Sequence, residues 1–299
     1  MFQKMVVIGP TKLTDDSKVK LKEYASEVIY NERILEEEDD LARVIGDADG
    51  VLVTLEIKVT RKVIEQCPNI RYIGMCCSLY SPESANVDII AANERGIVVT
   101  GIRDYGDEGV VEYVISELVQ LLHGFGKNMW KQEPYELTGQ KIGVLGMGTL
   151  GTLISRALKF FGADVSYYSR TRKPEREAEG IRYRELDDLM QNVDICIGCL
   201  NKNAIIVHQE QLDLFGNGKI LMNVSIGPFT DDNALRNWLK DSSNYFMCDK
   251  AWCLGDESLE ILPNVLCLNK GAGSSYQLIG RYNKKVLGNI EAFLEAENK

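Results

Sequence analysis

The chain has 299 residues, enough for two domains that each bury a core of their own. Its formal net charge of -10 argues against nucleic acid or an anionic membrane as the main partner. No apolar run approaches the length of a membrane span, and no signal-peptide pattern precedes the first apolar segment. We therefore expect a cytoplasmic protein.

Strand and helix patterns alternate through the first third of the chain. Apolar runs predict strands at 4–9, 27–30, 50–55, 71–76 and 97–100. The segments between them predict helices at 15–25, 38–45, 61–66 and 87–95. Alternation of this kind is typical of a doubly wound parallel sheet, and this one carries no glycine loop of the phosphate-binding type.

Two further helices frame the rest of the chain. The first, at 107–122, begins with acidic residues that suit the positive end of a helix dipole. The second, at 276–296, has one apolar face, and we expect it to pack back on the first domain.

Between these helices, residues 141–151 predict a buried strand, a glycine turn and the start of a helix. Gly146, Gly148 and Gly151 form G-x-G-x-x-G, whose glycines allow a tight turn, a close approach to a pyrophosphate and close helix packing. An apolar helical stripe, Gly162 and a strand at 163–168 follow, which completes one βαβ unit. We assign cofactor phosphate binding to Gly146, Gly148, Thr149, Leu150 and Gly151; the alternative is that the glycines serve packing only.

The end of that second strand indicates which dinucleotide binds. It reads Ser169, Arg170, Thr171, Arg172 and Lys173, without the carboxylate that usually contacts the ribose of NAD. Arg170 can pair with a phosphate, and Ser169 and Thr171 can donate to its oxygens. The sequence favours NADP, with NAD as the second choice; a solvated basic turn is the alternative.

The eight cysteines predict no metal site. Cys196 and Cys199 form C-x-x-C, but they fall in a predicted buried strand, where residues three apart face opposite sides. The other six show no zinc-ligand spacing. We expect buried, reduced thiols.

Several segments, in this order, resemble landmarks of the D-isomer-specific 2-hydroxyacid dehydrogenase family: 71–80, 94–100, 105–112, 136–143 and 262–265. The resemblance implies a Rossmann cofactor domain at 104–275, inserted into a flavodoxin-like substrate domain made of 1–103 and 276–299. It also implies a homodimer. It assigns substrate contacts to the loop of Ser78, Leu79 and Tyr80. To the cofactor it assigns Cys199, Leu200, Asn201, Val224, Ser225, Ile226 and Asp249.

The usual catalytic set of the family is absent. Ile226 stands where the family has a carboxylate-binding arginine, and Lys270 where it has the acid/base histidine. The family's glutamate has no clear counterpart in 248–257. Because isoleucine cannot bind a carboxylate, neutral or differently charged carbonyl substrates become more plausible.

Proton transfer then needs another group. Lys270 could serve if desolvation favoured its neutral form, and Tyr105 is a second candidate. His123 and His208 both fall outside the expected position. The sequence thus predicts an NADP-favouring oxidoreductase acting on a small carbonyl or alcohol substrate with a non-standard proton donor. The alternative is a non-catalytic NADP(H)-binding sensor or scaffold.

Overall fold

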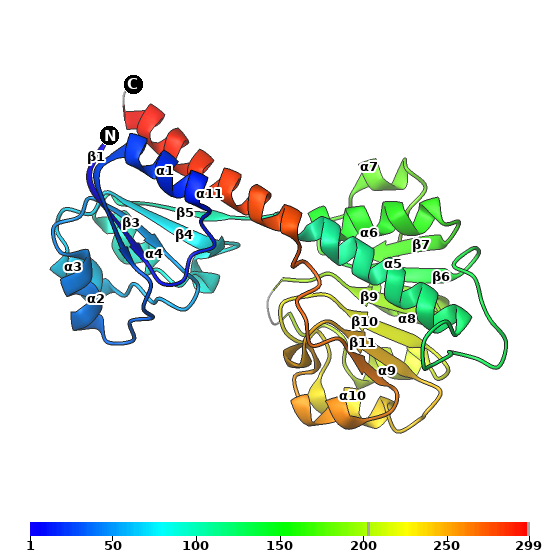
Figure 1. The fold of residues 1–299 in the computed structure, drawn as a ribbon. Helices are drawn as coiled ribbons and strands as arrows, with labels where there is room; N and C mark the ends of the chain where they lie inside the picture. The colour runs from blue at the N-terminus through cyan, green and yellow to red at the C-terminus, as the bar shows by residue number, and fades with distance from the viewer. Residues whose placement is uncertain (202–203, 298–299) are drawn as a thin grey trace. The chain divides into compact units, whose positions relative to one another are not determined.

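A computed structural model describes residues 1–201 and 204–297. The chain divides into two compact units (Figure 1). The N-terminal unit comprises Met1–Tyr105 together with the segment that starts at Ser275, and the central unit comprises Gly106–Ser274. The substrate role of the first and the cofactor role of the second remain predictions.

The N-terminal unit is built on a five-stranded parallel sheet in the order β2-β1-β3-β4-β5. This is the flavodoxin-like strand order, so the predicted α/β class of this unit is confirmed. The strands are β1 (Phe2–Ile8), β2 (Ala25–Asn31), β3 (Gly50–Val53), β4 (Tyr72–Ser78) and β5 (Val98–Ile102). The helices are α1 (Asp15–Tyr24), α2 (Glu38–Ile45), α3 (Arg61–Gln66), α4 (Ile89–Glu94) and α11 (Tyr276–Glu297), with a short 3-10 turn η1 (Pro82–Ser84).

Alternation along β1 divides the N-terminal unit into two apolar layers. Met5 and Val7 lie in the cluster that includes α1 and α11, whereas Val6 and Ile8 lie in the cluster that includes α2, α3 and α4. Successive strand residues point to opposite faces, so one strand supplies both layers. In Figure 1, α1 and α11 run together along one side of the sheet.

The C-terminal helix α11 packs on the N-terminal unit, as its apolar face predicts. Tyr282, Val286, Ile290 and Phe293 are buried in the cluster shared with α1. Asn283 adds polar contacts, because its side chain accepts from the Thr14 amide (3.0 Å) and donates to the Lys12 carbonyl (3.0 Å). Packing against distant parts of the chain therefore holds the helix in place.

The central unit has a seven-stranded parallel sheet in the order β12-β11-β10-β9-β6-β7-β8. Counted from β6, this is the Rossmann order 3-2-1-4-5-6 with a seventh strand added, which confirms the predicted class. The strands are β6 (Lys141–Leu145), β7 (Asp164–Tyr168), β8 (Arg182–Tyr183), β9 (Ile195–Gly198), β10 (Ile220–Asn223), β11 (Tyr245–Cys248) and β12 (Val265–Cys267). The helices are α5 (Asp107–His123), α6 (Thr149–Phe160), α7 (Pro174–Glu177), α8 (Leu186–Asn192), α9 (Gln209–Phe215) and α10 (Asp232–Trp238), with 3-10 turns η2 (Ala251–Leu254) and η3 (Glu257–Ile261).

Helices cover both faces of this second sheet. One apolar cluster joins the sheet to α5 and α6, and another joins it to α8, α9 and α10. Within the described ranges, no helix combines the length and the apolar character that crossing a bilayer requires.

Candidate cofactor and substrate sites

Each of the three glycines that follow β6 has a different structural role. Gly146 has a φ of 95°, and a Cβ there would lie 2.4 Å from the Cys199 carbonyl oxygen. A Cβ at Gly151 would lie 2.0 Å from the Gly146 carbonyl oxygen, so α6 packs directly on the turn. Gly148 differs, because its φ is -81° and a Cβ there would meet no atom within 4 Å. Neither backbone conformation nor packing demands glycine at 148; as the N-cap of α6 it leaves room for a ligand to approach the helix amides.

The start of α6 lies beside this open position. Gly148 is the N-cap and provides no side-chain cap, and the first turn carries no acidic residue. The first intrahelical bond is donated by the Thr152 amide to the Gly148 carbonyl (3.0 Å). Because the first amides of a helix lack intrahelical acceptors, those of Thr149, Leu150 and Gly151 suit the anionic phosphates of a dinucleotide.

The basic turn after β7 is only partly available for a ligand. Arg172 is ion-paired with Glu177 (Nε to Oε1, 2.6 Å) and lies over the Tyr183 ring. The Ser169 hydroxyl donates to the Thr171 carbonyl (2.6 Å). Arg170 is exposed and has no hydrogen bond or ion pair with any residue in the described part of the chain. Arg170, the cation predicted to pair with a 2′-phosphate, is therefore free to do so.

One buried amide shapes the loops that follow β9 and β10. The Asn223 side chain donates to the carbonyls of Gly227 (3.0 Å) and Cys253 (2.9 Å) and accepts from the Ser225 amide (2.8 Å). The Ser225 hydroxyl in turn accepts from the Leu200 amide (2.9 Å). Asn223 thus links the predicted cofactor segments around 200 and 225, although it is not among the residues predicted from the sequence. Its place at the end of a buried apolar strand was the available signal.

The remaining predicted cofactor residues occupy the same edge of the central sheet. Val224 is half-buried, Asn201 is exposed, and the Ile226 side chain is 46% exposed. Asp249 follows β11, and its carboxylate accepts from the Ala272 amide (2.9 Å) and from the Cys253 thiol (3.7 Å). Asp249 therefore fastens the segment that contains position 272 to the end of β11.

Lys270 lies in that segment, exposed, and it makes no hydrogen bond or ion pair with the residues that the structure describes. The Lys270 side chain is thus not buried within the central unit. Asn269, just before it, has a φ of 54°, and its carbonyl accepts from the Lys250 ammonium (3.3 Å).

In the N-terminal unit, the predicted substrate loop follows β4. Ser78 is the last residue of the strand, and the carbonyls of Leu79 and Tyr80 accept from the Arg103 guanidinium. Tyr105 ends the first segment of this unit. Its carbonyl accepts from Arg281 (2.9 Å), and its ring meets the Tyr282 ring edge-on.

All eight cysteines are free thiols, as the sequence predicts. Six are buried; Cys199 and Cys267 are half-buried, which corrects the expectation that all are buried. Burial raises the pKa of Cys76 to about 12, of Cys77 to about 11 and of Cys253 to about 12. No group of three or more potential metal ligands occurs among the described residues.

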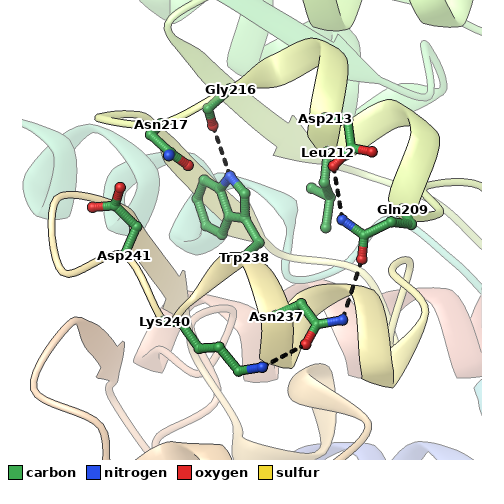
Figure 2. Close-up of a pocket in the computed structure, with 9 residues that line it drawn as sticks. All are labelled: Gln209, Leu212, Asp213, Gly216, Asn217, Asn237, Trp238, Lys240 and Asp241. Atoms are coloured by element: carbon green, nitrogen blue, oxygen red, sulfur yellow. Dashed lines mark hydrogen bonds between the residues drawn. The ribbon is translucent and has the colours of Figure 1, made fainter.

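A separate cavity of about 580 Å³ lies between α9 and α10 (Figure 2). Its polar lining is knit together by side chains: the Trp238 indole donates to the Gly216 carbonyl (2.8 Å), and the Lys240 ammonium donates to Asn237 (2.8 Å). The turns at 216–217 and 240–241 precede β10 and β11, so the cavity lies at the amino ends of these strands. The predicted cofactor residues lie at the carboxyl ends, and the cavity is not part of that site.

Known proteins share this arrangement. Residues 116–249 match the sequence model of the D-isomer specific 2-hydroxyacid dehydrogenase NAD-binding domain. The hydroxypyruvate reductase of Blautia hydrogenotrophica is 30% identical over 220 residues, which cover 67% of each protein. The chain belongs to the D-isomer-specific 2-hydroxyacid dehydrogenase family.

Solved structures agree with this membership in fold. A 2-hydroxyacid dehydrogenase from Ketogulonicigenium vulgare Y25 superposes on this dehydrogenase with a TM-score of 0.80 at 22% identity, covering 98% of this chain and 96% of the other. An acyclic imino acid reductase in complex with NADPH and D-Arg gives a TM-score of 0.80 at 22% identity, with coverage of 98% and 97%. This family member is a nicotinamide-dependent oxidoreductase that acts on the CH–OH group of a small molecule.

Proposed function

We propose that this dehydrogenase uses NADP(H) to interconvert a small 2-oxo acid and its 2-hydroxy acid, with a proton donor other than histidine. The observation that carries the proposal is the open Gly148 position beside the start of α6, which has no side-chain cap and leaves its first amides facing space that a pyrophosphate can enter. A related protein is a hydroxypyruvate reductase, which supports a 2-oxo acid over the neutral carbonyl considered from Ile226 alone. It also argues against a non-catalytic sensor.

The preference for NADP over NAD rests on the turn after β7. This turn has an unpaired exposed Arg170, and Glu177, the nearby carboxylate, is already bound to Arg172. A 2′-phosphate would give Arg170 a bidentate partner, while the Thr171 hydroxyl supplies a further donor. The structural neighbour solved with NADPH is consistent with this choice.

The residues of the central unit would orient the cofactor as follows. Amides at the start of α6 would bind the pyrophosphate, and the loops at 199–201 and 224–226 would support the nicotinamide half. Asp249 would accept from the carboxamide with the lone pairs that Ala272 and Cys253 leave unused. Bound NADPH would supply the hydride. Lys270 or Tyr105 would then donate a proton to the substrate oxygen.

The test is oxidation of NADPH and, in parallel, of NADH by the purified protein with glyoxylate, hydroxypyruvate, pyruvate and a neutral ketone. We expect turnover with 2-oxo acids and NADPH. Turnover with the ketone alone would refute the substrate class, and absence of turnover despite measured NADPH binding would refute the enzymatic proposal.

We also propose a homodimer, on family membership alone. Light scattering of the purified chain tests it, and a monomeric mass would refute it. The cytoplasmic location expected from the sequence stays a prediction.

A further inference from the structure

Arg103 lies at the carboxyl edge of the sheet in the N-terminal unit, beside the predicted substrate loop. It follows β5, the neighbour of β4 in the parallel sheet, so it lies at the same carboxyl edge as the substrate loop that follows β4. Its Nε donates to the Leu79 carbonyl, and one Nη donates to the Tyr80 carbonyl (3.2 Å). Ligands of open α/β sheets bind at the carboxyl edge, where this arginine is held.

The charge of Arg103 is not compensated by these contacts. The side chain is exposed and forms no ion pair with any residue within 1–201 and 204–297. A guanidinium has five N–H groups, and the two carbonyls use two of them, so three remain. The two carbonyls and the Tyr80 ring, 5.3 Å from the guanidinium carbon, fix the plane of the group. A fixed planar fork with unused donors is the geometry that binds a carboxylate in a bidentate manner.

The same unit contains a second arginine that also donates to backbone carbonyls but lies away from the substrate loop, so it can serve as a control for Arg103. Arg95 follows α4, and its guanidinium donates to the carbonyls of Ile64 and Pro68 (3.0 Å to the latter). It too is exposed and has no ion pair in the part of the chain that the structure describes. Because α4 precedes β5, Arg95 lies at the amino edge of the sheet, away from the substrate loop.

We infer that Arg103 binds the carboxylate of the substrate at the loop formed by Ser78, Leu79 and Tyr80. The inference rests on the proposed function, which supplies a 2-oxo acid. It gives the anion a partner in a chain that has Ile226 at the position where the family resemblance places the carboxylate-binding arginine. Position 103 is thus a specificity residue, and it acts by direct contact with the substrate.

The experiment compares Arg103→Gln and Arg103→Lys with the matched control Arg95→Gln in the full chain. Each variant is assayed for KM and kcat with glyoxylate and hydroxypyruvate. Each is also titrated by calorimetry with oxamate, an unreactive 2-oxo acid analogue, in the presence of saturating NADPH. NADPH affinity and the urea midpoint are measured for every variant, so that loss of fold is recognised.

Loss of a charged hydrogen-bond anchor predicts a rise of about 10- to 100-fold in KM and in the oxamate Kd for Arg103→Gln. Arg103→Lys keeps the charge but not the fork, so it should fall between this variant and the unaltered protein. NADPH affinity should stay the same, and Arg95→Gln should behave like the unaltered protein.

Three results would overturn the inference: an unchanged oxamate Kd in Arg103→Gln, an equal loss in Arg95→Gln, or no oxamate binding by the unaltered protein. Its failure is distinct from failure of the proposed function. Oxamate binding that depends on Arg103, without turnover of any 2-oxo acid, would support the anion site and refute the enzymatic proposal.

Discussion

Replacing Gly148 and Gly151 in turn by alanine should separate cofactor binding from folding. At 148 the new Cβ enters open space at a φ of -81°, so the chain accepts it without strain. Alanine restricts the unfolded chain more than glycine does, which stabilises the folded protein by about 0.4–1 kcal/mol. Loss of the glycine N-cap destabilises α6 by a similar amount. The free energy of unfolding should therefore change by less than about 1 kcal/mol.

Gly151→Ala, in contrast, should destabilise the fold. Its Cβ would lie 2.0 Å from the Gly146 carbonyl oxygen, whereas such contacts essentially never fall below 3.0 Å, so α6 must move away by about 1 Å. The neighbour is backbone and cannot rotate aside, which places the cost at about 1–3 kcal/mol or more.

NADPH affinity gives the second half of the comparison. The methyl group at 148 would occupy the approach of the pyrophosphate and weaken its bonds to the helix amides. Charged hydrogen bonds of this kind contribute about 1.5–3 kcal/mol each, so the Kd should rise about 10- to 100-fold. Urea denaturation and a fluorescence titration with NADPH measure the two effects. A Gly148→Ala variant that binds NADPH normally would refute the assignment of this turn to the cofactor.

Three further predictions follow from single side chains. Arg170→Ala should weaken NADPH binding about 10- to 100-fold and leave NADH binding nearly unaffected, which parallel titrations with the two cofactors would measure. Equal losses for NADPH and NADH would exclude a contact between Arg170 and the 2′-phosphate. The control is Arg172→Ala, which should have little effect because Arg172 is already paired with Glu177. Lys270→Met should abolish turnover and leave NADPH affinity unchanged. Single-turnover kinetics of Lys270→Met and of Tyr105→Phe would measure this, and undiminished turnover in one of the two variants would exclude that residue as the proton donor. Hydrogen bonding to Arg156 lowers the pKa of Glu179 from 4.5 to about 2, so its stabilising contribution is present above pH 4.5 and is lost as the pH falls toward 2. Acid unfolding of Glu179→Gln should accordingly depend less steeply on pH in that window, and an identical pH profile would show that this exposed pair contributes nothing.

Much of the fold follows from patterns that are local in sequence. The local pattern of a segment predicts its own conformation, as it does for the glycine spacing after β6, the apolar stripe of α6 and the β-branched strands. The alternation of strands with helices then implies parallel sheets. The predicted bounds of α2 and α3 coincide with the observed ones. Short elements such as β8, α10 and β11 were not predicted, because a few residues give too little periodicity and their neighbours in the sheet hold them.

The candidate site depended more on contacts that no local pattern encodes. Sequence alone determined the glycine turn, the basic turn after β7, the absence of the family's arginine and histidine, and the resemblance that led to the family. Only the tertiary structure decided that Arg172 is already paired with Glu177, that Asn223 ties two loops together, and that Arg103 donates to the carbonyls of Leu79 and Tyr80. The physical reason is that propensity and periodicity act over a few residues. The partner of a polar side chain is instead set by which chain segments the folded sheet brings to the same edge.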